Sequence, residues 1–161
     1  MSKKSKLKVI AKIEGEAYEL IWEAAITGAW RNVKEWLQRD PGLIKAAGEV
    51  TLEGESRPFI MSLLHVAVTI NPDVEFIEYL LSAGADVRAV CINWDDSLER
   101  SYHTPTVLHL AAQYNPNIEV LECLISANTN VNAQDYDGRI PLEVADTEEK
   151  KHLLRQAMTA K

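Results

Sequence analysis

The sequence predicts an all-α repeat solenoid, a row of short helix pairs in which each pair packs on the next. Two observations carry this prediction. A block around the dipeptide Leu-His occurs twice along the 161-residue chain, and a second block that begins with Asn-Pro follows each copy. Such self-similarity indicates units that cannot bury their apolar faces alone and therefore stack into one continuous core. With 47% hydrophobic and 25% charged residues, the composition suits one globular domain.

The Leu-His block predicts the first helix of each unit. Residues 64–68 read LHVAV and residues 108–112 read LHLAA. Weaker copies are found at residues 21–25 (IWEAA) and 142–145 (LEVA). Because the terminal units of a solenoid have only one neighbour and are usually atypical, these weaker copies indicate capping repeats at both ends.

The Asn-Pro block predicts the second helix of each unit. Residues 71–81 and 115–125 share one apolar stripe at helical spacing. The stripe consists of Phe76, Ile77, Leu80 and Leu81 in the first copy and of Val120, Leu121, Leu124 and Ile125 in the second. Proline disfavours helix in the residue before it, so Asn-Pro fits the turn between the two helices.

Four polar or glycine residues mark the ends of these second helices. Asp73 and Asn117 follow the prolines, where a side-chain acceptor satisfies free N–H groups at a helix N-terminus. Gly84 follows the first copy, where a left-handed residue ends a helix without a steric penalty. Asn128 occupies the matching place, and asparagine is the next best residue there.

Together these blocks resemble the ankyrin repeat family, whose signature is T-P-L-H-x-A on a period of about 33 residues. Residues 104–111 (TPTVLHLA) are a stretched version, and residues 135–142 (DYDGRIPL) match the finger and helix start, with Ile140 in place of the usual Thr. The resemblance covers residues 17–158 and implies about four helix-turn-helix repeats. It also implies that His65 and His109 bond backbone between neighbouring repeats, rather than forming the metal pair that two histidines would otherwise suggest.

The resemblance sets provisional boundaries within a single ankyrin repeat domain. We assign residues 1–161 to this domain, with an N-terminal extension (1–15), an N-capping repeat (16–47), a second repeat (48–90), a third repeat (91–134) and a C-capping repeat (135–161).

The spacing of the repeats predicts two extended β-hairpin fingers. Leu108 and Leu142 are 34 residues apart, but Leu64 lies 44 residues before Leu108 and 43 after Ile21, about ten more than the family period. The extra residues lie at 46–58 and 89–104. Apolar residues there alternate with polar ones around turn residues, as in a β-hairpin, and two neighbouring hairpins would pair into a small sheet. Similar alternation at residues 7–13 leaves open a strand on that sheet or an extra helical turn.

The net charge of −7 disfavours a nucleic-acid partner, because phosphate binding needs clustered Lys and Arg. It favours a basic protein partner, although acidity also keeps a protein soluble. We find no apolar run of membrane-spanning length and no secretory leader, so we expect a cytoplasmic protein that binds no membrane. Cys91 and Cys123 stand outside any C-x-x-C pair and are expected to be free thiols that act as small buried hydrophobes. The position of Cys91 on a finger leaves half exposure open as an alternative, whereas Cys123 lies on the buried helix stripe.

No catalytic, cofactor or metal motif is present, and we therefore expect no enzyme activity and no cofactor. The concave face and the fingers are the candidate binding surface, since Tyr and Trp concentrate binding energy at interfaces. Mapping the family pattern onto this chain gives the candidate partner-binding residues Trp94, Asp95, Asp96, Tyr102, Glu53, Arg57, Thr69, Ile70, Gln113, Tyr114 and Tyr136. For Trp94, packing between the two hairpins is an equal alternative.

The sequence therefore predicts a protein-protein interaction module that uses its concave face and finger hairpins. A sharper version is an inhibitor or immunity-type protein of bacterial origin, which rests on analogy alone. The alternative is an enzyme or small-ligand-binding protein with a cleft between the long hairpins and the inner helices. We expect a monomer, and a dimer through the hairpin edges is the remaining possibility.

Overall fold

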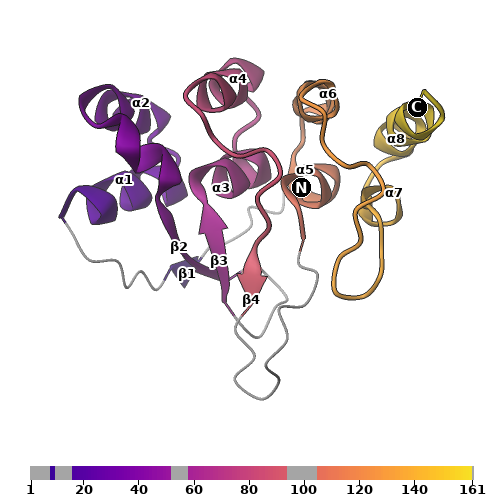
Figure 1. Cartoon of the computed structure of the whole chain (residues 1–161), viewed down its shortest axis with the longest axis horizontal. Coiled ribbons are helices and arrows are strands. Elements are labelled where there is room, and N and C mark those ends of the chain that lie inside the picture. Colours follow the sequence, from indigo (N-terminus) through magenta and orange to yellow (C-terminus); the bar gives the residue numbers. More distant parts are fainter. Residues whose placement is uncertain (1–7, 10–15, 52–57, 94–104, 161) are drawn as a thin grey trace.

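The computed structural model describes residues 8–9, 16–51, 58–93 and 105–160. In these ranges the chain forms four helix pairs that follow one another in a row (Figure 1). The inner row consists of α1 (Glu16–Ile26), α3 (Leu63–Ile70), α5 (Val107–Tyr114) and α7 (Pro141–Val144). The outer row consists of α2 (Trp30–Arg39), α4 (Val74–Ser82), α6 (Ile118–Ser126) and α8 (Glu148–Thr159). The mostly helical repeat fold expected from the sequence is confirmed.

The two Leu-His copies begin their helices in the same way. Ser62 and Thr106 each stand at the N-cap, and their side-chain oxygens accept from the backbone N–H of His65 and His109, both at 3.4 Å. In return, each histidine Nδ1 accepts from the backbone N–H of its capping residue, at 3.2 and 3.3 Å. These reciprocal bonds satisfy free donors at the helix start, and they place the two histidines at equivalent positions of adjacent layers.

The predicted ends of the outer helices are confirmed. The side chains of Asp73 and Asn117 accept from the backbone N–H two residues later, at 3.1 and 3.0 Å. Gly84 and Asn128 both have positive φ, 95° and 63°, just after α4 and α6. Each helix therefore stops where a residue that tolerates the left-handed region occurs.

The core runs through both rows as one cluster of buried apolar side chains. From the predicted stripes, Phe76, Ile77 and Leu80 are fully buried, whereas Leu81 at the edge is only partly covered. Trp22 on α1 is also fully buried. No helix in the part of the chain that the structure describes has the length and apolar character needed to cross a membrane.

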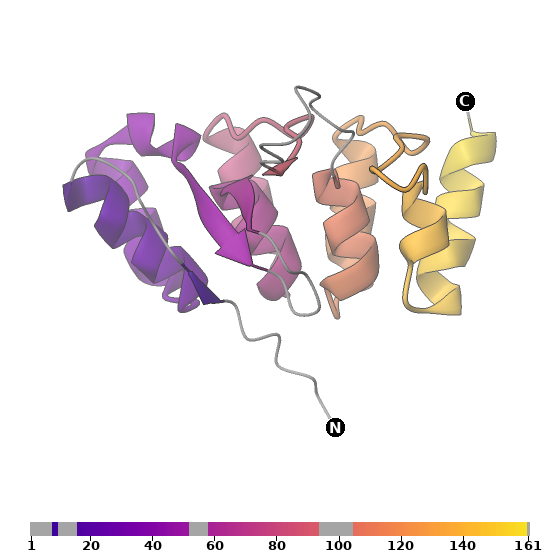
Figure 2. The ribbon, with the colours of Figure 1, turned by 90° about the horizontal axis from the view of Figure 1, so that it is seen from below.

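A small antiparallel sheet projects beside the inner helices (Figures 1 and 2). A 3-10 helix, Pro41–Lys45, leads into it, and its strands are β1 (Lys8–Val9), β2 (Ala47–Thr51), β3 (Phe59–Ser62) and β4 (Ile92–Asn93), in that order. The antiparallel pairing of β2 with β3 confirms the first finger, and the pairing of β3 with β4 joins it to the second. At residues 8–9 the strand alternative is correct, because β1 pairs with β2.

The second finger differs from the expectation in the direction of its side chains. Cys91 is 1% exposed, while Val90 and Ile92 are 52% and 49% exposed, so the buried alternative for Cys91 is correct and the half-exposed one is wrong. The cause is the register of β4: Ile92 lies opposite Ile60 on the outer face of the sheet, and the neighbouring Cys91 must point inward. Cys123, expected to be buried, is partly exposed at the edge of its stripe.

Candidate functional site

A cleft of about 240 Å³ opens where α5 meets the third finger, the loop between α6 and α7. Its walls come from β3, the segment before α5, α5 itself, the third finger and α7. The lining residues are Phe59, Pro105, His109, Leu110, Gln113, Tyr114, Asp135, Tyr136, Asp137, Arg139 and Val144. Segments that are far apart in the sequence thus meet on the concave side, where the sequence predicts the binding surface.

The third finger is a tight turn built around the carboxylate of Asp135. One oxygen, Oδ1, accepts from the backbone N–H groups of Asp137 and Arg139, at 3.0 and 2.9 Å. The other, Oδ2, accepts from Arg139 Nε at 3.0 Å. Gly138 supplies the positive φ of 75° that closes the turn. Asp135 is consequently 3% exposed and holds the turn together from inside.

His109 attaches this finger to α5. Its Nε2 lies 2.9 Å from the carbonyl oxygen of Arg139, while its Nδ1 accepts from Thr106. One neutral tautomer, with the proton on Nε2, satisfies both bonds. Burial lowers the pKa of His109, and the Arg139 carbonyl and the Asp135 carboxylate offset this only in part. The imidazole therefore stays neutral near pH 7 and acts as a fixed structural donor.

The rim of the cleft carries the exposed groups of the finger. Tyr136 is 39% exposed, and the guanidinium of Arg139 lies 6.0 Å from the centre of its ring. Arg139 also pairs with the exposed carboxylate of Asp137 at 2.8 Å. Its hydrogen bond to Asp135 raises the pKa of Arg139 further, so this cation is permanent. Aromatic, cationic and anionic groups are thus held in fixed relative positions.

The structure brings three of the predicted binding residues together and separates the others. Gln113, Tyr114 and Tyr136 all line the cleft. Ile70 lies one helix pair away at the end of α3, partly buried, and is not among the lining residues. The remaining predicted positions on the fingers lie outside the described residues: Glu53, Arg57, Trp94, Asp95, Asp96 and Tyr102.

Thr69 is a correction. The sequence places it on the exposed side of the inner helix, but it is 3% exposed, and its hydroxyl donates to the carbonyl oxygen of His65 at 2.7 Å. Threonine often bonds back to the preceding turn in this way. Such a bond satisfies the hydroxyl inside the protein and allows the side chain to be buried.

Sequence reasoning missed the polar part of the cleft. Asp137 and Arg139 belong to the DYDGR segment, of which only Tyr136 is a candidate contact in the sequence. The signal was present, because an Asp that precedes Gly by three residues favours a turn that fixes its neighbours. Phe59 directly follows the first predicted finger (residues 46–58), and nothing in the local sequence indicates that it reaches a cleft formed with α5.

The titratable groups of the cleft are engaged in structural bonds. Both nitrogens of His109 and both carboxylate oxygens of Asp135 have partners within the turn and the helix cap. Burial raises the pKa of the Cys91 thiol far above its usual range, so that thiol is inert. Within the described ranges, no three His, Cys, Asp or Glu side chains are grouped to hold a metal ion. In this arrangement His109 and Asp135 hold the cleft surface in place, and neither side chain has an unoccupied polar atom that faces the cleft.

Residues 64–154, more than half of the chain, match the sequence model of a family described as ankyrin repeats (3 copies). A comparison with curated proteins found no match. The matched segment contains nearly all of α3, the whole of α4 to α6, the third finger, α7 and part of α8, and therefore nearly all of the cleft.

Proposed function

From the premise that the chain belongs to the ankyrin repeat family, we propose that it binds a partner protein through the cleft between α5 and the third finger. Members of this family generally mediate protein–protein interaction and are typically not enzymes. The observation that carries the proposal is the meeting of Gln113, Tyr114 and Tyr136 at one cleft on the concave side. We also propose about four ankyrin repeats with the boundaries given above, two of them with hairpin fingers.

The size of the cleft favours a protein partner over a small ligand. At about 240 Å³ it is smaller than the roughly 300–1,000 Å³ of typical small-molecule sites. A volume of this size suits one side chain of a partner, with the surrounding concave face supplying the rest of the contact. The enzyme alternative would need convergent free titratable groups, whereas His109 and Asp135 are already engaged.

The partner that we propose is basic where it meets the third finger. Asp137 is an exposed carboxylate at the rim, and the net charge of the chain is −7. Such charges steer a basic surface toward the cleft and fix its orientation. An inhibitor or immunity-type protein would be one form of this activity, in which the bound partner is a toxin or an enzyme. Two free cysteines among the described residues accord with a cytoplasmic location, which we also propose.

Site-specific photocrosslinking tests this proposal. A photoreactive residue at position 113 lies in the cleft, and one at position 156 lies exposed on α8 in the outer row. In lysate of the source cells, we expect position 113 to capture one partner that position 156 does not capture.

With that partner purified, we expect Tyr136→Ala to weaken binding at least tenfold, because truncation of an interface tyrosine often costs more than about 2 kcal/mol. The matched control Gln156→Ala should leave affinity unchanged. Capture by position 156 alone would place the binding surface on the outer row and refute the proposed site.

A further inference from the structure

The outer helices carry charge at two equivalent positions that change sign along the row. Arg31, Glu75 and Glu119 are each the second residue of their helix, and consecutive members are 44 residues apart. The fifth residues of the same helices are Lys34, Glu78 and Glu122, again 44 apart. Both positions are thus positive on α2 and negative on α4 and α6. We call the surface formed by these six side chains the outer charged face.

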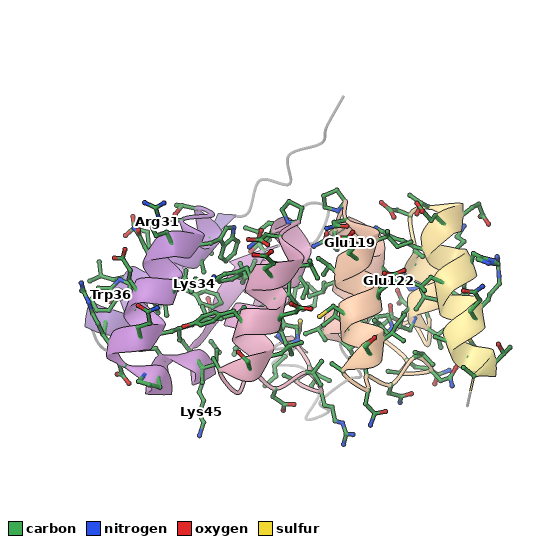
Figure 3. The ribbon with its side chains drawn as sticks, turned by 90° about the horizontal axis from the view of Figure 1, so that it is seen from above. Arg31, Lys34, Trp36, Lys45, Glu119 and Glu122 are labelled. Atoms are coloured by element: carbon green, nitrogen blue, oxygen red, sulfur yellow. The ribbon has the colours of Figure 1, made fainter. Side chains whose placement is uncertain are left out.

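All six belong to the outer helices. The four that Figure 3 labels, Arg31, Lys34, Glu119 and Glu122, lie on the side of the molecule away from the inner helices. Five of the six are exposed. Lys34 is half buried, because its ammonium lies 5.0 Å from the centre of the Tyr79 ring on α4. Ion pairs within the described residues are confined to positions 135–155, and none involves this face. Charges of both signs therefore stand next to each other without neutralising partners.

The same separation of charge holds for these three outer helices as a whole. Helix α2 contains three Lys or Arg and one Glu, whereas α4 and α6 each contain two Glu and no Lys or Arg. A surface that is positive at one end and negative beside it is complementary to a reversed copy of itself.

We propose that the outer charged face pairs with a second copy of this chain in a two-fold dimer. The axis lies between α2 and α4 and runs parallel to the helices. Rotation about this axis reverses the order of the outer helices in the second copy, so that its α4 faces α2 of the first. It does not shift any residue along the direction of the helices. Because the charged positions are at equal heights, Arg31 then meets Glu75 of the second copy, and Lys34 meets its Glu78. Symmetry repeats both pairs, as expected for an isologous contact.

Other two-fold arrangements of this face bring like charges together. An axis perpendicular to the helices would place α2 on α2 of the second copy, with cations facing cations. An axis over α4 would place Glu75 against its own symmetry mate. The half-buried aromatic rings of Trp36 on α2 and Tyr79 on α4 flank the proposed contact and add the residue types that favour interfaces.

The proposed dimer is weak and depends on salt. Exposed charge pairs are individually weak, and each copy carries a net charge of −7. At about 0.1 M salt the Debye length of about 10 Å screens the distant repulsion and leaves pairs in contact largely intact. We expect association at roughly hundreds of micromolar protein and its loss near 1 M salt. This inference uses a surface opposite to the cleft and is independent of the proposed function.

Charge exchange between two variants tests the arrangement. Arg31→Glu/Lys34→Glu makes both helices negative, and Glu75→Lys/Glu78→Lys makes both positive. Each variant alone should remain monomeric when its mass is measured by sedimentation equilibrium in 0.1 M salt. An equimolar mixture should form a heterodimer, because every contact in it again joins opposite charges. Formation of that heterodimer also shows that both variants are folded.

The matched control is Glu119→Lys/Glu122→Lys. It changes the net charge by the same amount as Glu75→Lys/Glu78→Lys, but on α6, outside the proposed contact. It should dimerise at least as well as the wild type. Equal loss of association in these two variants would show that net charge matters and placement does not, and would overturn the proposal. A wild type that stays monomeric at every concentration would also overturn the proposal and would mean that any partner of this face is a different protein.

Discussion

His65 in the second helix pair and His109 in the third cap their helices in the same way and differ on the far side of the ring. Nε2 of His109 lies 2.9 Å from the Arg139 carbonyl, whereas Nε2 of His65 has no hydrogen-bond partner among the described residues. The asparagines of the two turns repeat the contrast. Asn115 Nδ2 donates to the carbonyls of Val68 and Asn71, but Asn71 Nδ2 has no acceptor within the same ranges.

The difference shows that the repeated motif determines the fold of each unit, while the bonds between units depend on the neighbour. The short third finger, which follows α6, brings the Arg139 carbonyl into a hydrogen bond with His109. The longer second finger, which follows α4, brings the Ala89 backbone near enough to His65 to offset part of the lowering of its pKa, but leaves Nε2 without a hydrogen bond of good geometry. On the other side, Asn71 faces a first pair that lacks the Asn-Pro turn. The first half of the molecule is held by apolar packing instead. Trp22 packs so closely against β2 that a Cβ on Gly48 would lie 2.6 Å from its Nε1.

The largest expected effect comes from removing that packing. Trp22→Ala should lower the free energy of unfolding by about 3–5 kcal/mol, because it leaves a large cavity under the sheet. Trp36→Ala is the control: its ring is only partly buried and is partly covered by Arg39, so we expect about 1 kcal/mol or less. Urea denaturation followed by circular dichroism gives both values. Similar losses in the two variants would show that the first half does not depend on Trp22.

The next effect is a loss of stability in acid. Burial lowers the pKa of His65 to about 4, and the pKa of His109 is lowered as well. As the pH falls, the histidines of the unfolded chain become protonated near pH 6.5, whereas those of the folded chain stay neutral. The free energy of unfolding is therefore at its full value above pH 6.5 and decreases as the pH drops toward 4. For His65 the difference corresponds to about 3 kcal/mol. Unfolding at a series of pH values measures it.

The control for this pH dependence is the exposed His152 on α8. His152→Gln should leave the fall in stability between pH 6.5 and 4 unchanged, whereas His65→Gln should flatten it. If His65→Gln retained the full slope, the titrating group would have to be a different one.

A smaller effect separates the two asparagines. Asn115→Ala leaves two buried carbonyls, those of Val68 and Asn71, without their donor and should cost about 2–3 kcal/mol. Asn71→Ala loses only the bond that its Oδ1 accepts from Asp73, and should cost about 1 kcal/mol. The comparison by urea denaturation isolates the contribution of the bonds between units. Equal losses in the two variants would mean that the hydrogen bonds from Asn115 to Val68 and Asn71 contribute nothing to stability.

The sequence predicts the parts of this molecule that local chemistry decides. Helix caps, the Asn-Pro turns and the left-handed positions after α4 and α6 all follow from residues within one unit. The cleft could be predicted only in part, because Phe59, Gln113 and Tyr136 come from three different units. For a related reason the sequence misplaced Thr69 and left the exposure of Cys91 open: burial depends on the neighbouring layer and on strand register, and neither is encoded in the flanking residues.

The smallest expected effect exchanges the residues that end the outer helices. Gly84 and Asn128 occupy equivalent left-handed positions, and a Cβ on Gly84 would meet no atom within 4 Å, so only the backbone conformation matters there. Asn128→Gly should stabilise the protein by a few tenths of a kcal/mol, because glycine adopts φ of 63° without a steric penalty. Gly84→Asn should destabilise it by somewhat more, about 0.5–1 kcal/mol, since 95° lies further from the region that asparagine tolerates. Thermal unfolding of both variants beside the wild type tests the opposite signs. A loss of stability in Asn128→Gly would mean that the Asn128 side chain contributes more than its tolerance of the left-handed region.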